Sequence, residues 1–341
     1  MNSTEIAKLA NVSRSTVSRV INNYKNVPIE TREKVQAVIA KYGYTPNVSA
    51  RTLAGKSNNI IGLFLADIDI HNSNGKYIGA TSPYNAELLS HIIDSCKNRG
   101  YLTLVYTISD MKECQEMEQY FINRMIFGGI FVGFPYRTQE VELLAKKEHN
   151  IVLIDQLSIE SDLKKEFKLV NSNDAEGGYL ATKHLIEQGH TKIVYVDGDY
   201  RLSAIERKNG FLKAMTEANI LVKDKDILKG EYREDIAYKV MKKYLEKECP
   251  TAVFVANDIM ALGVVRAIQE KGLSIPEEIS VIGYDGLVAS AWNQLNLTTM
   301  KVDLSEVAER SVAMLFDKNS SVHKECHATL VMGNTVNIKK V

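Results

Sequence analysis

The sequence predicts two unlike parts: an all-α head with a helix-turn-helix and a hinge helix, and an α/β body of two doubly wound parallel-sheet subdomains. Apolar residues recur at helical spacing within the first fifty residues. From residue 60 onward, runs of Val, Ile and Leu alternate with amphipathic stretches, a pattern typical of parallel sheets covered on both faces. The chain has 341 residues, 45% of them hydrophobic, so it is long enough for more than one domain.

Two short helices at the N-terminus are predicted to share one core. The predicted core positions are Ile6, Leu9, Ala10, Val17, Val20 and Ile21. Asn2 and Glu5 have the spacing of a capping box, and the hydroxyl of Ser13 suits the N-cap of the second helix. Asn11 between the helices suits a left-handed turn. These signals predict a helix, a turn and a second helix.

The opposite face of the second helix carries polar side chains that suit the major groove of DNA. Arg14, Ser15, Ser18, Arg19 and Asn22 lie on this face, mostly near the N-terminus of the helix. An ordinary helical hairpin with a solvated polar face is the alternative. Charge favours DNA, because residues 1–57 hold nine basic and three acidic side chains, whereas the whole chain holds 42 of each.

A third helix over 30–42 is predicted to close the head, with Gly43 as its C-cap. Its core positions are Val35, Val38 and Ile39. Asn47 can cap one more short helix over 48–54, which Gly55 ends. A helix of this length is unstable alone in water, so it needs DNA, a second copy of itself, or both.

The body is predicted to contain seven strands alternating with helices. Candidate strands are 60–65, 102–106, 129–132, 151–154, 192–196, 252–255 and 279–284. Candidate helices are 87–99, 114–127, 140–149, 176–188, 205–218, 236–246 and 259–271. Because seven such units exceed one small sheet, we expect two similar subdomains with a cleft where the carboxyl ends of both sets of strands face each other.

Composition argues against several other classes of protein. No stretch reaches the roughly 20 apolar residues of a membrane span, and we expect a cytoplasmic protein without a membrane partner. The four cysteines are scattered without a CxxC pair, which indicates reduced thiols. His323, Cys326 and His327 have metal-like spacing but no second ligand cluster, so we interpret them as surface polar residues. We find no phosphate loop or nucleophile elbow and expect no catalytic residue, metal or cofactor.

The order of these features resembles the lactose-repressor and galactose-repressor (LacI/GalR) family of bacterial transcription regulators over the whole chain. The blocks that carry the resemblance include IAKLA (6–10), TVSRV (16–20), ARTL (50–53), NDIMALG (257–263) and PEEISVIGYD (276–285). The resemblance implies a periplasmic-binding-protein-like body. We expect a head over 1–46, a hinge helix and linker over 47–58, and a body over 59–341. In the body we expect a first lobe of roughly 59–168 and 300–328, and a second of roughly 169–299 and 329–341.

The resemblance implies a homodimer whose two heads bind the half-sites of a near-palindromic, double-stranded operator. Arg14 and Ser15 fall where the family reads bases, and Arg19 falls at a further base-contacting position, where its fork can pair with guanine. Leu53 falls on the hinge leucine that family members insert into the minor groove, beside Ala50. The expected DNA-binding residues are Arg14, Ser15, Thr16, Ser18, Arg19, Asn22, Ala50 and Leu53.

Several residues of the body fall where sugar-responsive members of the family hold ligand hydroxyls. The expected effector-binding residues are Tyr84, Asp155, Arg201, Ser203, Arg207, Asn257, Asp285 and Trp292. Carboxylates accept hydrogen bonds from hydroxyls, and Arg and Asn donate them. Alternatively, Asp155 or Asp285 caps a helix or braces the two lobes. We expect a repressor of carbohydrate-utilisation genes that a small sugar-like effector releases from DNA by changing lobe closure.

The sequence departs from the family pattern at three places. Asn85 stands where many relatives have an aromatic residue that stacks on the effector, with Tyr84 one position earlier. Residues 70–81 are extra and can reshape the pocket or the dimer face, and Pro28 replaces the usual capping hydroxyl of the third helix. Two alternatives stay open. One is a purine-type, corepressor-dependent regulator, and the other is a sugar-binding or sugar-processing enzyme with a helical head.

Overall fold

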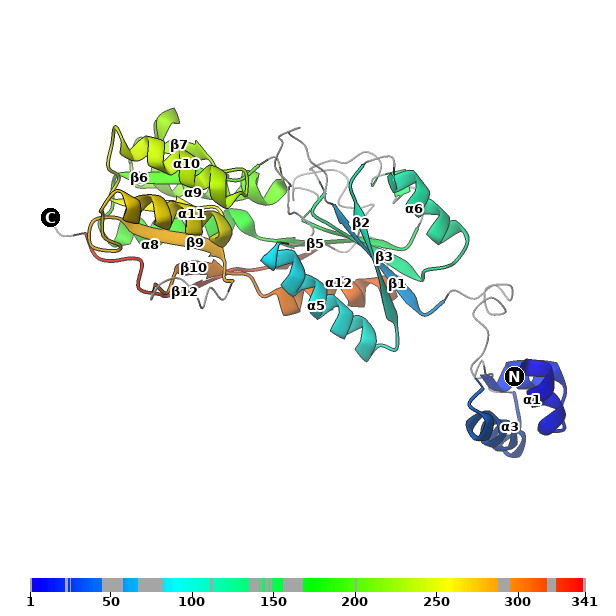
Figure 1. Ribbon diagram of the computed structural model, residues 1–341. Helices are drawn as coiled ribbons and strands as arrows, with labels where there is room; N and C mark the ends of the chain where they lie inside the picture. The colour runs from blue at the N-terminus through cyan, green and yellow to red at the C-terminus, as the bar shows by residue number, and fades with distance from the viewer. Residues whose placement is uncertain are drawn as a thin grey trace. The chain divides into compact units, whose positions relative to one another are not determined.

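The computed structural model forms two compact units (Figure 1). One unit comprises Met1–Ile60 with Gln119–Phe127, and the other comprises Ile61–Glu118 with Gly128–Val341. The structure describes residues 2–21, 24, 26–44, 58–66, 82–110, 113–134, 141, 143–144, 147, 149–155, 168–199, 201–287, 295–317 and 323–339. None of the helices in this described part is long and apolar enough to cross a membrane.

The head consists of three helices with the predicted end signals. Their bounds are α1 (Ser3–Leu9), α2 (Arg14–Ile21) and α3 (Ile29–Tyr42). The Asn2 side chain accepts from the backbone N–H of Glu5, whose carboxylate accepts from the Asn2 backbone N–H, so the capping box is confirmed. Asn11 has a φ of 52°, and the Ser13 hydroxyl accepts from the backbone N–H of Thr16 at 3.0 Å. The turn and the N-cap of α2 are therefore also confirmed.

The core of the head corrects one sequence prediction. Its buried residues are Ile6, Ala7, Ala10, Val17, Val20, Val27 and Val35. Leu9, which the sequence predicts in this core, is 47% exposed, because Ala7 and not Leu9 lies beside Ile6 and Ala10 on the inward face of α1. Gly43 ends α3 in the left-handed conformation, as predicted, and Pro28 precedes α3 without a side-chain cap. The predicted hinge helix over 48–54 lies outside the described residues.

The first lobe of the body is built on a six-stranded sheet in the order β11-β5-β4-β3-β1-β2. Its strands are β1 (Ile60–Ala66), β2 (Leu102–Ile108), β3 (Gly128–Val132), β4 (Ile151–Ile154), β5 (Lys168–Ser172) and β11 (His323–Cys326). Its helices are α5 (Pro83–Asn98), α6 (Glu113–Ile122) and α12 (Leu304–Phe316). Although α12 comes from late in the chain, it packs against α5 and covers β3, β4 and β5 (Figure 1).

The second lobe repeats this plan with the order β12-β10-β9-β8-β6-β7. Its strands are β6 (Ile193–Asp197), β7 (Ile227–Lys229), β8 (Ala252–Val255), β9 (Ser280–Asp285), β10 (Thr298–Lys301) and β12 (Thr329–Val331). Its helices are α8 (Asp174–Glu187), α9 (Leu202–Glu217), the 3-10 helix η2 (Asp224–Asp226), α10 (Glu234–Leu245) and α11 (Asp258–Glu270). All its described strand pairs are parallel except β10 with β12. The predicted pair of doubly wound parallel-sheet subdomains is confirmed.

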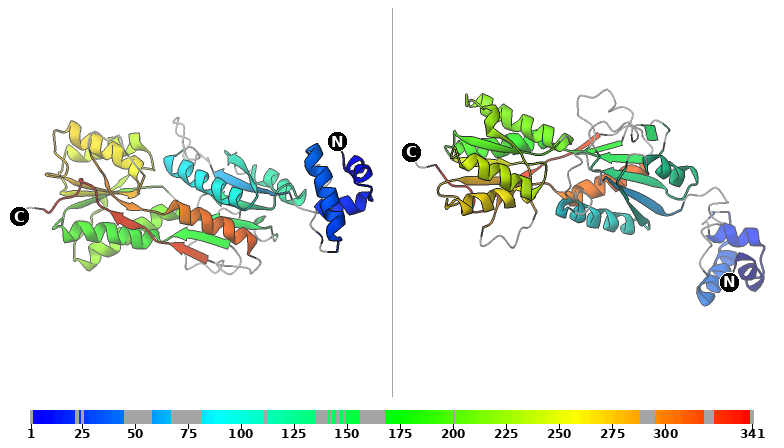
Figure 2. Two further views of the ribbon diagram at one scale, coloured as in Figure 1. Left: turned by 90° about the horizontal axis from the view of Figure 1, so that it is seen from below. Right: turned by 45° about the horizontal axis from the view of Figure 1, so that its top comes forward.

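The chain crosses between the two lobes three times (Figure 2). The crossings follow β5 at Ser172, β10 at Lys301 and β11 at Cys326. The sequence predicts these crossings near 168, 300 and 328, because its apolar pattern predicts no strand at β5 or β10. Each lobe therefore contains elements from two separate stretches of the chain, and the crossings lie beside the carboxyl ends of β5 and β10.

Several elements differ from the sequence prediction. The strands β5, β7, β10, β11 and β12 and the helix α12 are additional to it. The predicted helix over 114–127 ends at Ile122, because Arg124 adopts a left-handed φ of 52°. The predicted helix over 140–149 and the extra loop over 70–81 fall largely or wholly outside the described residues.

Candidate functional site

The exposed face of α2 carries four of the predicted DNA-binding side chains. Arg14, Ser15, Ser18 and Arg19 are exposed, whereas Val17 and Val20 are buried in the head core. Helical periodicity separates these two sets, as predicted. Exposure leaves the four polar side chains accessible to a groove of DNA.

Thr16 differs from the other predicted DNA-binding residues of α2. Its side chain is only partly exposed, and its hydroxyl lies 2.8 Å from the Ser13 hydroxyl. In this arrangement Thr16 belongs to the cap at the start of α2. The predicted contacts of Asn22, Ala50 and Leu53 lie outside the described residues.

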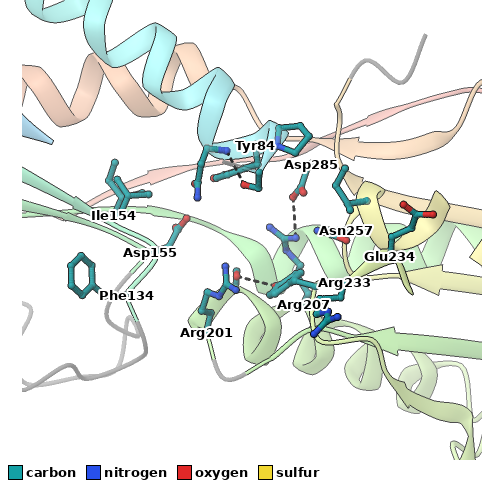
Figure 3. A pocket seen from close by; sticks show the side chains of 18 of the residues that line it. Tyr84, Phe134, Ile154, Asp155, Arg201, Arg207, Arg233, Glu234, Asn257 and Asp285 are labelled. Atoms are coloured by element: carbon teal, nitrogen blue, oxygen red, sulfur yellow. Dashed lines mark hydrogen bonds and ion pairs between the residues drawn. The ribbon is translucent and has the colours of Figure 1, made fainter. Parts of the chain in front are cut away.

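The body contains a cavity of about 440 Å³ that seven of the eight predicted effector-binding residues line. These seven are Tyr84, Asp155, Arg201, Ser203, Arg207, Asn257 and Asp285 (Figure 3). The eighth, Trp292, lies outside the described residues. Residues from both lobes form the walls, as expected for a cleft between the carboxyl ends of two parallel sheets. The volume suits a small organic ligand.

The two cavity aspartates occupy equivalent places in the two lobes. Asp155 follows β4 and Asp285 ends β9, and each of these strands is third in the order of its sheet. Asp155 has a φ of 52° and Asp285 a φ of 108°, a conformation that residues other than glycine adopt at an energetic cost. Such strained residues cluster at ligand sites. The Asp155 carboxylate also accepts from the backbone N–H of Ser172 at 2.8 Å, so it braces the end of β5 as well.

Arg207 on α9 is the most tightly held side chain of the cavity. It is buried, and its Nε donates to Asp174 Oδ1 at 2.8 Å while its Nη1 donates to Asp285 Oδ1 at 3.0 Å. Nη1 also donates to the carbonyl oxygen of Ala256, and the guanidinium lies over the Tyr284 ring at 3.7 Å. A buried guanidinium bound to two carboxylates fixes the orientation of both.

Two glycines allow α8 and α9 to approach closely enough to place Arg207, and a third makes room for Tyr284. A Cβ on Gly178 would lie 2.3 Å from the Arg207 carbonyl oxygen, and one on Gly210 would lie 2.2 Å from the Ala175 carbonyl oxygen. A Cβ on Gly177 would overlap the hydroxyl of Tyr284. The sequence block that contains Gly177 and Gly178 therefore has a packing role that supports the cavity.

Three acids in or near the cavity have raised pKa values. Burial raises the pKa of Asp155 to about 7, and the neighbouring Asp174 carboxylate adds to the shift. Burial also raises the pKa of Asp285 to about 7, against the opposing effect of Arg207. The pKa of Glu206 rises to about 8, chiefly through burial and then through Asp174 and Asp155. The charge of the cavity therefore changes near neutral pH.

Two aromatic side chains line the cavity that the sequence analysis did not identify. Phe134, from the end of β3, and Tyr232, from the turn after β7, both contribute to its walls. Tyr232 packs under Arg201, whose guanidinium lies 4.9 Å from the ring centroid, and its hydroxyl lies 3.0 Å from that of Ser203. Tyr232 follows β7, a three-residue strand that the sequence does not predict, so no sequence signal marked it.

The remaining polar residues of the cavity lining include a helix cap, a buried amide and two carboxylates. The Asn257 side chain caps α11 by accepting from the backbone N–H of Met260 at 2.8 Å, and Asn257 also lines the cavity. Asn85, which replaces the usual aromatic residue, is buried and lines the cavity beside Tyr84. Glu234 and Asp235, at the start of α10, were not predicted.

In the metal-like cluster predicted to consist of surface polar residues, His327 is exposed as predicted and Cys326 is not. His327 Nδ1 lies 2.6 Å from Glu176 Oε2, and Cys326 is buried. Across the ranges given above, no group of three or more His, Cys, Asp or Glu side chains is arranged to hold a metal ion.

Comparisons with known proteins cover both parts of the chain. Residues 4–47 match the family model "Bacterial regulatory proteins, lacI family", and residues 182–339 match "Periplasmic binding protein-like domain". Two repressors named PurR, from Mannheimia succiniciproducens and Vibrio vulnificus, are each 33% identical to the chain, with 97% of both chains covered. A lac repressor dimer bound to operator and the anti-inducer ONPF matches with a TM-score of 0.82 at 26% identity, covering 99% of both chains.

A further solved structure, a complex of the regulator CelR with cellobiose, shares the fold, with a TM-score of 0.72 at 23% identity and 98% of this chain covered. The head, the two-lobed body and the sequence relatives agree over nearly the full length of the chain. The chain belongs to the lacI family of bacterial regulatory proteins and is a DNA-binding transcriptional repressor.

Proposed function

We propose that a small sugar-like molecule binds in the cavity of this repressor and releases it from a near-palindromic operator. The observation that carries the proposal is that seven polar residues, which the family resemblance implies as effector-binding, line one cavity. They come from segments up to 201 positions apart, from Tyr84 to Asp285. We further propose that the regulated genes serve carbohydrate utilisation and that the repressor acts in the cytoplasm, where its DNA target lies.

The chemistry of the cavity supports a sugar. Asp155 and Asp285 supply carboxylate acceptors, and Arg201 and Asn257 supply donors. The ring of Phe134 or Tyr232 can cover the apolar C–H face of a sugar. Alternating acceptors and donors satisfy the many hydroxyl groups of a polyol, which is costly to bury without hydrogen bonds.

The head supports DNA contact through the exposed face of α2. We propose that Arg14, Ser15, Ser18 and Arg19 reach base edges or phosphates in the major groove. Two copies of the head are needed for a palindrome, so we propose a homodimer. Asn22, Ala50 and Leu53 keep their proposed DNA roles, and Trp292 its proposed effector role.

A purine corepressor is the second candidate for the ligand. Phe134 and Tyr232 give the cavity the aromatic walls that Asn85 does not supply, and such walls suit a planar base. The name PurR of two full-length relatives favours this candidate as well. In that case the ligand strengthens DNA binding and does not release the repressor.

A thermal-shift screen against sugars, uronic acids and purines distinguishes the two candidates, because a ligand that binds only the folded state raises Tm. We expect a sugar to raise Tm for the wild-type chain and for Glu217→Ala, which removes an exposed carboxylate from the far end of α9. The same sugar should have no effect on Asp285→Ala. A shift from hypoxanthine or guanine alone would favour the purine candidate.

A further inference from the structure

Among the described residues, the cavity lining contains more carboxyl groups than guanidinium groups. Within the described part of the chain, the lining contains three guanidinium groups, from Arg201, Arg207 and Arg233. It also contains four carboxyl groups, which belong to Asp155, Glu234, Asp235 and Asp285. The balance of the lining is therefore acidic, and the partners of each cation decide what charge a ligand can carry.

Each guanidinium already has a carboxylate partner. Arg207 binds Asp174 and Asp285, as described above. Arg201 Nη2 lies 2.7 Å from Asp199 Oδ2, and its Nε lies 2.9 Å from the same atom. Arg233 Nε lies 3.1 Å from Asp235 Oδ1. An anionic ligand would have to compete with these carboxylates for each described cation of the cavity lining.

Two acids near the cavity have no cationic partner among the described residues. One oxygen of Asp155 accepts from the Ser172 backbone, and the carboxylate forms no ion pair. Figure 3 shows this carboxylate pointing into the cavity. The Glu206 side chain on α9, which lies close enough to Asp155 to raise its own pKa, forms no ion pair or hydrogen bond with a described residue. Above about pH 8, where both acids are ionised, this corner of the cavity therefore repels negative charge and offers an acceptor to a donor group.

Four helices begin at the cavity among the described residues, and helix N-termini usually attract anions. At α5 the Ser82 hydroxyl accepts from the backbone N–H of Asn85, and the N-termini of α9, α10 and α11 each have an internal acceptor as well. The backbone N–H of Arg201 at the start of α9 donates to Asp199 at 2.9 Å. Glu234 and Asp235 lie in the first turn of α10, and the Asn257 side chain caps α11. The helix dipoles are thus partly neutralised before any ligand binds.

We propose that the cavity selects an uncharged ligand that donates a hydrogen bond to Asp155, and that it rejects the phosphorylated form of the same compound. This inference rests on the proposed function, because it assumes that the effector occupies the cavity. It applies equally to a free sugar over a sugar phosphate and to a free base over a nucleotide.

Calorimetry and thermal shift with the full-length chain test this selection on matched pairs of probes. The pairs are glucose with glucose 6-phosphate, ribose with ribose 5-phosphate, trehalose with trehalose 6-phosphate, and hypoxanthine with inosine 5′-monophosphate. We expect the uncharged member of at least one pair to bind, and its phosphorylated partner to bind at least about tenfold more weakly. At about pH 9, where Glu206 is ionised, this ratio should shrink in Glu206→Gln, because that variant removes negative charge without altering the cavity wall. Asp155→Asn should shrink it as well.

Glu217→Gln is the matched control, since it removes one charge from the exposed end of the same helix and should leave the ratio unchanged. Tighter or equal binding of a phosphorylated member would overturn the proposed selection and leave the proposed function standing. Binding by no member of any pair would count against both. An unchanged ratio in Glu206→Gln and Asp155→Asn together would also overturn the role of these acids.

Discussion

At the scale of single residues, the cavity depends on one buried cation surrounded by acids. Arg207 is 4% exposed and holds Asp174 and Asp285 within 3.0 Å. Each carboxylate would be costly to bury without this guanidinium. The same three groups thus stabilise the second lobe and orient Asp285 toward the ligand.

Arg207→Ala should lower the free energy of unfolding by about 3–5 kcal/mol, because it leaves two buried carboxylates without a counter-charge. Urea denaturation monitored by circular dichroism measures this loss. The control is Arg266→Ala, which breaks an exposed ion pair with Glu234 and should cost at most about 1 kcal/mol. Equal losses of unfolding free energy in the two variants would contradict the claim that Arg207 stabilises the two buried carboxylates.

Asp155→Asn should raise Tm more at pH 8 than at pH 5. The pKa of Asp155 lies near 7 in the folded chain and near 3.8 when unfolded, so the folded state holds its proton over that interval. The wild-type chain consequently loses stability as the pH rises from about 4 to 7, and the amide has no proton to lose. The Asn oxygen can still accept from Ser172. A gain in Tm that is the same at both pH values would show that Asp155 ionises normally.

Most polar residues of the site could be predicted from the sequence, because they lie in short blocks at the ends of strongly apolar strands. Asp285 ends an unbroken buried strand, and Asn257 precedes a clear helix. Tyr232 could not be predicted in this way. It lies in a turn where Glu231 and Tyr232 both have left-handed φ angles of 55° and 53°, a conformation that favours glycine or asparagine.

At the scale of elements, the close packing of α8 on α9 positions the cavity side chains. A Cβ on Gly178 would clash with the backbone of α9 at Arg207. The distance between the two helices therefore determines where the Arg207 guanidinium lies in the cavity. The neighbouring N-caps of α9, α10 and α11 bring three chain segments to the same wall. Small residues in these helices therefore influence ligand binding without touching a ligand.

Gly178→Ala should destabilise the body by about 1–3 kcal/mol and weaken ligand binding, because its Cβ forces α9 and Arg207 away from α8. Thermal denaturation with and without the ligand from the screen measures both effects. Gly272→Ala is the control, because Gly272 has a positive φ and a Cβ at this position would meet no other atom within 4 Å. That variant should cost about 1 kcal/mol and keep the ligand response. A normal ligand response in Gly178→Ala would contradict the packing argument.

Elements with buried apolar runs could be predicted from the sequence, and the short polar ones could not. β4 and β8 consist of four buried apolar residues each. β10 reads Thr-Thr-Met-Lys and β11 reads His-Lys-Glu-Cys, so neither shows an apolar run or a clear alternation. Both gain their strand geometry by pairing with β9 or β5, which is a tertiary effect.

At the scale of the whole molecule, the three crossings link the two lobes at the strand ends that form the cavity. Asp155 accepts a hydrogen bond from Ser172, which lies immediately before the first crossing. Asp285 pairs with Lys301 of β10, which lies immediately before the second crossing. A ligand that contacts both aspartates therefore acts directly on the segments that any change in lobe closure must bend. Ligand binding and DNA binding are then linked reciprocally.

Operator binding should depend steeply on salt, because the basic head must displace counterions from phosphates. Fluorescence anisotropy with an operator selected from random duplexes, at several salt concentrations, measures the slope. Arg14→Ala and Arg19→Ala should each weaken binding, because both side chains lie on the proposed DNA-binding face of α2, and Lys271→Ala in the body should not. An affinity that is independent of salt would contradict DNA binding through the head.

The most direct test of ligand-controlled repression is the affinity for this selected operator with and without the ligand that raises Tm. For the wild-type chain we predict that a saturating sugar weakens operator binding by about 5- to 150-fold. Asp285→Ala should bind the operator normally and show no response to the sugar. An operator affinity that the ligand leaves unchanged in the wild-type chain would contradict control of DNA binding from the cavity.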